Sequence, residues 1–104
     1  MGYRLFVESE DKTLNFYGTK FYGYNFEYAS EGRKYASIRY LYELGKISDR
    51  TVFDYQYDIE FTLTAEQFAK FIVLYADEYG EDLLQNKEIR ALLADDRDKI
   101  LSWG

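Results

Sequence analysis

The sequence contains no histidine, no cysteine and no proline among its 104 residues. Histidine is the commonest general base and metal ligand near neutral pH, and cysteine is the usual soft ligand and activated nucleophile. Without these two residue types, most familiar active sites and any disulfide framework are excluded. Without proline, the fold has no cis-proline constraint. The absences favour a protein that binds over one that catalyses, so we expect no enzymatic activity, no catalytic residues, no cofactor and no bound metal.

Long apolar runs are missing as well. No stretch approaches the ~20 apolar residues that a membrane-spanning helix needs. At the N-terminus, Glu8, Glu10 and Asp11 follow before the apolar segment of a secretory signal could develop. The length suits one domain, so we expect a single domain over residues 1–104, located in the cytoplasm and without membrane contact.

Negative charge is concentrated in the second half of the chain. The net charge is −6; residues 1–50 hold eight Lys or Arg against seven Asp or Glu, whereas residues 51–104 hold five against twelve. A solvated surface that keeps a small protein soluble is the simpler explanation, and a charged interaction face is the functional one. Because phosphate contacts need clustered Lys and Arg, the acidity argues against direct binding of nucleic acid duplexes.

Aromatic residues are abundant, with 12 Tyr, 8 Phe and 1 Trp, and several lie in alternating patterns that predict strands. The clearest alternation runs over residues 52–63, and a similar one over residues 20–28. Residues 3–8 and 13–17 read as a first hairpin around a polar turn. The dipeptide 18–19, Gly-Thr, is expected to reverse the chain again before the next strand.

Residues 34–44 fit two patterns. Ile38 and Tyr40 alternate with polar neighbours, which predicts a strand that a turn at residues 45–50 joins to the following strand as a hairpin. The alternative is a helix, because Ile38 and Leu41 also fit a helical stripe.

Helical signals appear in the last third of the chain. Thr64 with Gln67 three residues later is a capping-box signature, and apolar residues follow at helical spacing. A second helix is predicted over residues 87–101. Strands first and helices second predict an α+β domain, with an antiparallel four- to five-stranded β-meander followed by two C-terminal α-helices packed on one face.

Carboxylates are the abundant acid–base groups, so a carboxylate enzyme is one alternative. Asp54, Asp58 and Glu60 share one face of a predicted strand, where alternate residues lie about 6.5–7 Å apart. That spacing is compatible with glycoside hydrolysis, but any solvated strand face shows it too. No phosphate-binding, dinucleotide-binding, serine hydrolase or zinc protease motif is present. The enzyme alternative is therefore the weakest.

The tyrosine-rich strand suggests a second alternative. Residues 20–27 partly resemble the sheet motif with which RNA-recognition domains stack bases: Lys20, Tyr22, Gly23 and Tyr24 match, whereas Phe21, Asn25 and Glu27 depart from it. The resemblance implies a single-stranded nucleic-acid-binding module with an exposed tyrosine face. Packing of the same tyrosines under the helices is the simpler explanation.

Two helices can cover only one face of the predicted sheet, so some tyrosines should remain on the open face. Exposed aromatic residues beside arginine are typical of protein interfaces. The candidate partner-binding residues of this aromatic face are Tyr22, Tyr24, Arg39 and Tyr40. An uncovered aromatic face could also meet a second copy of the chain, so a homodimer is a further alternative.

The leading hypothesis is a non-enzymatic acidic interaction protein that binds another protein. In size, acidity and lack of catalytic residues the chain is similar to small phage or mobile-element inhibitors, including anti-CRISPR and other DNA-mimic proteins. That similarity implies a partner that is itself a basic nucleic-acid-binding protein, whose groove the acidic chain would occupy. The candidate residues of the acidic face are Asp77, Glu78, Glu81, Asp82, Asp95, Asp96 and Asp98.

Overall fold

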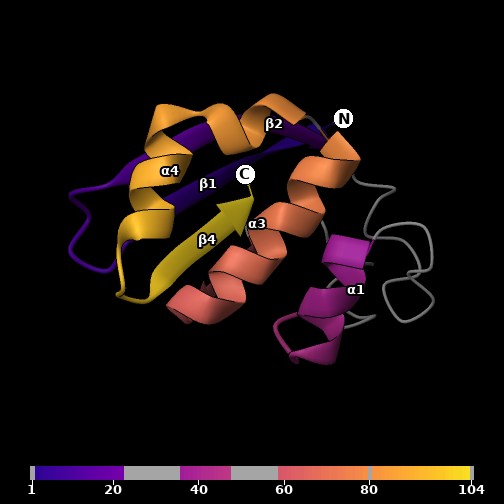
Figure 1. The fold of residues 1–104 in the computed structure, drawn as a ribbon. Helices are drawn as coiled ribbons and strands as arrows, with labels where there is room; N and C mark the ends of the chain where they lie inside the picture. The colour runs from indigo at the N-terminus through magenta and orange to yellow at the C-terminus, as the bar shows by residue number, and fades with distance from the viewer. Residues whose placement is uncertain (1, 23–35, 48–58, 80, 104) are drawn as a thin grey trace.

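The computed structural model describes residues 2–22, 36–47, 59–79 and 81–103. Its elements are β1 (Gly2–Ser9), β2 (Asn15–Tyr22), α1 (Ala36–Glu43), β3 (Ile59–Leu63), α3 (Ala65–Tyr79), the 3₁₀ helix η3 (Glu81–Gln85), α4 (Lys87–Ala94) and β4 (Lys99–Trp103). The strands form one sheet in the order β2-β1-β4-β3, and all neighbouring strands are antiparallel. Helices α3 and α4 lie across one side of the sheet, and α1 packs against α3 (Figure 1). The predicted α+β class and the four-stranded antiparallel sheet are confirmed.

The predicted meander with two C-terminal helices is wrong in its order. Three α-helices are present in the described segments, one of them before β3, and the last element is a strand that lies between β1 and β3. The helix predicted over residues 87–101 ends at Ala94. Asp95 then adopts an extended conformation, with φ −84° and ψ 132°, and its N–H donates to the carbonyl of Leu92. After a turn at residues 95–98, Lys99–Trp103 pair with β1 on one side and with β3 on the other, which outweighs the helical pattern of this segment.

The strand predicted over residues 34–44 is wrong for Ala36–Glu43, where the helical alternative is confirmed as α1, so the hairpin built on that strand is wrong as well. Ile38 and Leu41, three residues apart, are both fully buried. The helix ends in a Schellman motif, because Gly45 has a φ of +74° and donates to the carbonyl of Tyr42, while Lys46 donates to Leu41. Gly45 therefore ends a helix and does not open a β-turn.

The first hairpin is confirmed, but β2 is longer than predicted. It continues through residues 18–19, where the register with β1 shifts in a bulge and the chain does not reverse. A Cβ on Gly18 would lie 2.7 Å from the ring of Phe16, so glycine permits the close approach of that ring. Of the strand predicted over residues 52–63, Ile59–Leu63 is observed; residues 48–58 and 23–28 lie outside the described residues.

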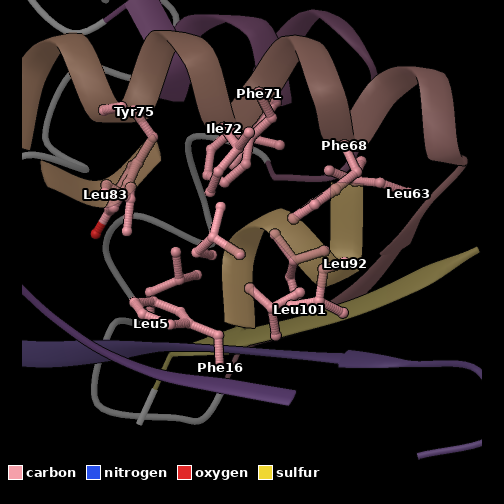
Figure 2. Packing of buried hydrophobic residues seen from close by; sticks show 14 of the residues in the cluster. Leu5, Phe16, Leu63, Phe68, Phe71, Ile72, Tyr75, Leu83, Leu92 and Leu101 are labelled. Carbon is pink, nitrogen blue, oxygen red and sulfur yellow. The ribbon is translucent and has the colours of Figure 1, made fainter. Parts of the chain in front are cut away.

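Helix α3 begins at the predicted capping box and supplies much of the core. The side chain of Gln67 accepts from the N–H of Thr64 at 3.1 Å, and Thr64 Oγ1 accepts from the N–H of Gln67 at 3.2 Å. The buried side chains of α3 point toward those of the sheet and α4 (Figure 2): Phe68, Phe71, Ile72 and Tyr75 against Leu5, Phe16, Leu92 and Leu101. No helix in the described segments is both long and apolar enough to cross a membrane.

Candidate interaction surface

The sheet has one buried face and one face that the helices leave open. Alternate residues of each strand are buried: Leu5, Val7 and Ser9 in β1, Phe16 in β2, Phe61 and Leu63 in β3, and Lys99 and Leu101 in β4. The residues between them are half-buried or exposed. They form two rows across the strands, Asn15–Glu8–Ile100–Thr62 and Tyr17–Phe6–Ser102–Glu60, as the strand registers show. We call these eight residues the open sheet face.

An aromatic pair occupies one end of the open sheet face. Tyr17 of β2 is 62% exposed, and its ring contacts that of Phe6 in β1 edge to face, with 5.9 Å between centroids. Among the described residues, Tyr17 and Val73 are the large hydrophobic residues left most exposed. A tyrosine held by a neighbouring ring presents a large, rigid and amphipathic contact surface, which is typical of an interface anchor.

The described charged side chains of the open sheet face are carboxylates. Glu8 and Glu60 are the two charged residues of the open sheet face, and both are solvent-accessible. Just beyond the row that contains Glu8 lie the ends of β1 and β4, where Glu10, Asp96 and Asp98 are exposed. We call these three residues the acidic end. Past the bulge, β1 and β2 pair Arg4 with Lys20, so the acidic part of the surface is the part next to the acidic end.

A network of hydrogen bonds and ion pairs holds the acidic end in place. Asp11 Oδ1 accepts from the hydroxyl of Thr13 at 2.7 Å and from that of Ser9 at 2.8 Å, which shapes the β1–β2 turn. Arg97 then joins this turn to the α4–β4 turn, because its guanidinium pairs with Asp11 and, at 2.8 Å, with Asp95. The two turns at this end of the sheet are therefore tied to each other through one arginine.

The same contacts shift the ionisation of the network. Hydrogen bonds from Thr13, Arg97 and Ser9 hold the pKa of Asp11 far below its usual range, and Asp11 in turn raises the pKa of Arg97. Burial acts to raise the pKa of Asp95, but its hydrogen bonds and charge interactions with Lys99 and Arg97 together outweigh burial and lower it. Both carboxylates are thus held in the charged form.

We expect stability to fall in acid because of this network. A carboxyl group whose folded pKa lies below its unfolded value of about 3.9 contributes stability above that value and loses it as the pH falls further. The urea midpoint should therefore drop from about pH 5 downward. Asp11→Asn should lower the midpoint at pH 7 and flatten this acid dependence. Asp96→Asn, an exposed neighbour that forms no ion pair in the described segments, is the matched control; equal acid profiles for the two variants would contradict the assignment.

A buried lysine fixes the start of β4 beside this network. Lys99 is fully buried, and its Nζ donates to the carbonyl oxygens of Asp95, at 2.9 Å, and of Arg97. The same Nζ lies 3.0 Å from Asp95 Oδ2 and 5.9 Å from the centre of the Phe68 ring. A single cation thus satisfies the carbonyl groups that follow the end of α4, as basic groups do near helix C-termini.

The seven predicted acidic residues do not form one group. Asp77, Glu78, Glu81 and Asp82 belong to the end of α3 and the start of η3, whereas Asp95, Asp96 and Asp98 belong to the α4–β4 turn. Figure 1 shows these two places at opposite ends of the molecule. Asp77, Asp82, Asp96 and Asp98 are exposed, and the side chain of Glu81 is outside the described part. A continuous acidic face over all seven residues is therefore not observed.

Two of these seven residues have partners within the chain. Asp95 pairs with Lys99 and Arg97 as described above. Glu78 accepts a hydrogen bond from the N–H of Ser37 at 2.9 Å, and the Ser37 hydroxyl donates to its other carboxylate oxygen. Ser37 lies in the first turn of α1 and is fully buried. Glu78 therefore caps α1 and joins it to α3.

The predicted aromatic residues are also separated. Arg39 and Tyr40 lie on helix α1 and not on the sheet: Arg39 pairs with Glu43 at 3.1 Å, and Lys70 Nζ lies 4.7 Å from the ring centre of half-buried Tyr40. Tyr22 is the last residue of β2, and its side chain is not among those that the structure describes. Tyr24 lies outside the described residues.

Of the three carboxylates considered for an enzyme, the structure describes one. Glu60 lies on the open sheet face, whereas Asp54 and Asp58 are outside the described residues. No group of three or more carboxylates among the described residues is arranged to hold a metal ion.

Sequence reasoning missed the residues that matter most on this surface, Phe6, Glu8 and Tyr17. The adjacent pair Phe16 and Tyr17 lies in a predicted strand, so one of the two must face away from the core, but only the register with β1 decides which. Comparison of the chain with protein-family models, with curated proteins and with solved structures gives no match.

Proposed function

We propose that this chain is a non-enzymatic acidic interaction protein that binds a basic nucleic-acid-binding protein through the open sheet face and the acidic end. The observation that carries the proposal is the exposed Tyr17, held by Phe6 with the carboxylate of Glu8 in the neighbouring row. An aromatic anchor with acidic neighbours is complementary to a partner surface that presents arginine or lysine around an apolar pocket.

More specifically, the chain is proposed to act as an inhibitor, similar to the anti-CRISPR and other DNA-mimic proteins of phages and mobile elements. The chain would then occupy the groove in which its partner holds nucleic acid, with carboxylates in place of phosphates. The net charge of −6 supports this form, because it would steer the encounter with a basic groove. Since such partners act on nucleic acid inside the cell, the proposal also places the chain in the cytoplasm.

Affinity capture from nuclease-treated lysate tests the proposal. Tagged wild-type protein should retain a basic protein that duplex DNA and high salt each release. Tyr17→Ala should weaken retention by at least about tenfold, because it removes the anchor. Glu8→Lys should weaken it and flatten its salt dependence. Glu66→Lys, an equal charge change on the exposed side of α3, is the matched control and should retain the partner.

Four results would contradict the proposal. Equal retention by all four proteins, or no retention by any, would mean that the open sheet face binds no such partner. Captured nucleic acid that nuclease removes would favour single-stranded nucleic acid binding instead, with Tyr17 and Phe6 as the stacking pair. Self-association in sedimentation that Tyr17→Ala abolishes would assign the face to a homodimer.

A further inference from the structure

A second accessible apolar surface lies in the helical layer, apart from the open sheet face. Its described lining residues are Val73, Leu74, Ala76 and Asp77 of α3 and Leu84 of η3, and they border an open groove of about 360 Å³. Ligand pockets span roughly 300–1,000 Å³, so this groove lies at the small end of that range. Its size suits one large side chain better than a cofactor.

Val73 gains little from burial within the chain. It lies in the middle of α3 and is 53% exposed. A β-branched residue lowers helix propensity because its side chain loses rotamer freedom, and an exposed one gains little from burial in return. The helix itself would be better served by alanine, lysine or glutamate at this position. Contact with an apolar group from outside the chain would explain the valine.

The charges beside the groove indicate which kind of ligand it would bind. Asp77 is the one charged residue among the described residues that line the groove, and it is exposed. Asp82 of η3, the element that follows α3 and contacts it, adds a second exposed carboxylate near the end of α3. A ligand that places a cation beside its apolar group would therefore satisfy both the groove and its acidic side.

We propose that this groove docks an amphipathic segment of a protein partner, with a large aliphatic side chain against Val73 and Leu84 and a lysine or arginine paired with Asp77. The inference goes beyond the proposed function, because it concerns a different surface and does not depend on the open sheet face. Two separate docking surfaces would allow the chain to hold one partner at two points or to bridge two partners.

Fluorescence anisotropy with labelled synthetic peptides tests the groove directly. The probe is a leucine–lysine peptide; a lysine–serine peptide and a leucine–glutamate peptide are its controls. Wild-type protein should prefer the leucine–lysine peptide over both. Val73→Asp and Asp77→Lys should each weaken its affinity at least tenfold. Glu66→Lys, which changes the net charge as much as Asp77→Lys on the same helix, should change it less than twofold, and so should Tyr17→Ala.

The comparison of Asp77→Lys with Glu66→Lys decides the outcome. Equal losses in these two variants, or equal binding of the lysine–serine peptide, would show only general attraction of a basic peptide to an acidic protein and would overturn the inference. Loss of peptide binding with Tyr17→Ala would move the site to the open sheet face. Because Val73 and Asp77 are exposed, thermal unfolding should be nearly unchanged in their variants, so misfolding can be recognised separately.

Discussion

Replacement of Lys99 with methionine is expected to lower the free energy of unfolding by roughly 3–5 kcal/mol, the usual cost of removing one partner from a buried ion pair. The side chain is fully buried and its Nζ contacts the carboxylate of Asp95 and two carbonyl oxygens. Methionine has a similar shape but no donor, so it would leave all three oxygen partners without this cation. Urea denaturation at pH 7 measures the change.

Lys87→Met is the matched control for this experiment. Lys87 is exposed at the start of α4, so its replacement should change stability by less than about 0.5 kcal/mol. Equal stability of the two variants would contradict the structural role assigned to Lys99. Because a domain of this kind has a total stability of only about 5–15 kcal/mol, a Lys99→Met protein that does not fold agrees with the prediction.

The second large effect is expected for Glu78. Glu78→Ala removes the acceptor of both hydrogen bonds from Ser37, which is buried at the start of α1. Hydrogen bonds to charged groups contribute about 1.5–3 kcal/mol, and buried donors left without a partner cost a similar amount. We therefore expect a loss of about 1.5–3 kcal/mol in urea denaturation, with loosening of α1 against α3 visible as faster amide hydrogen exchange in α1.

Asp77→Ala provides the comparison for Glu78→Ala. The two residues are adjacent on α3, but Asp77 is exposed and makes no ion pair in the described segments. Its replacement should leave stability and α1 exchange nearly unchanged. If both variants exchange alike in α1, then Glu78 is an ordinary surface carboxylate, as the sequence alone suggested, and does not cap the helix.

Local signals in the sequence predicted the parts of the fold that local chemistry determines. The capping box of Thr64 and Gln67 and the first hairpin are both present, because each depends on residues a few positions apart. The end of α4 was missed, since nothing in the sequence between Ala94 and Lys99 resembles a usual stop signal such as glycine or proline. The strand conformation of β4 is determined by its pairing with β1 and β3, and no local sequence pattern reveals this pairing.

Helix α1 also shows that local sequence patterns do not determine every element of the fold. An alternating pattern that combined Ile38 with two tyrosines favoured a strand over residues 34–44, yet Tyr40 and Tyr42 are only half-buried, whereas Ile38 and Leu41 are buried. Tyrosine is intermediate in burial, so an alternating tyrosine pattern is weak evidence for a buried face. The glycine at position 45 was the better signal, read as the end of a helix.

The sequence predicted that a tyrosine and several carboxylates are exposed, but it did not predict which residues these are. Reasoning from composition anticipated an open sheet face with exposed tyrosine and an acidic surface. It placed the tyrosines at positions 22, 24 and 40. Tyr40 lies on α1, the side chain of Tyr22 and all of Tyr24 lie outside the described residues, and the structure adds an exposed tyrosine on the sheet, Tyr17. The same reasoning also assigned Glu78 and Asp95 to a partner, although both carboxylates bind groups of the chain itself. Which carboxylates are free depends on tertiary contacts that sequence spacing does not show.

We propose that Tyr17 and Glu8 form the contact with a basic partner. Isothermal titration of the captured partner with wild-type, Tyr17→Ala, Glu8→Lys and Glu66→Lys proteins, each at low and moderate salt, tests it most directly. We predict at least tenfold weaker binding for Tyr17→Ala at both salt concentrations. Glu8→Lys should show a smaller salt dependence of binding, and Glu66→Lys should bind as the wild-type protein does. Wild-type affinity and salt dependence in both open-face variants would contradict it.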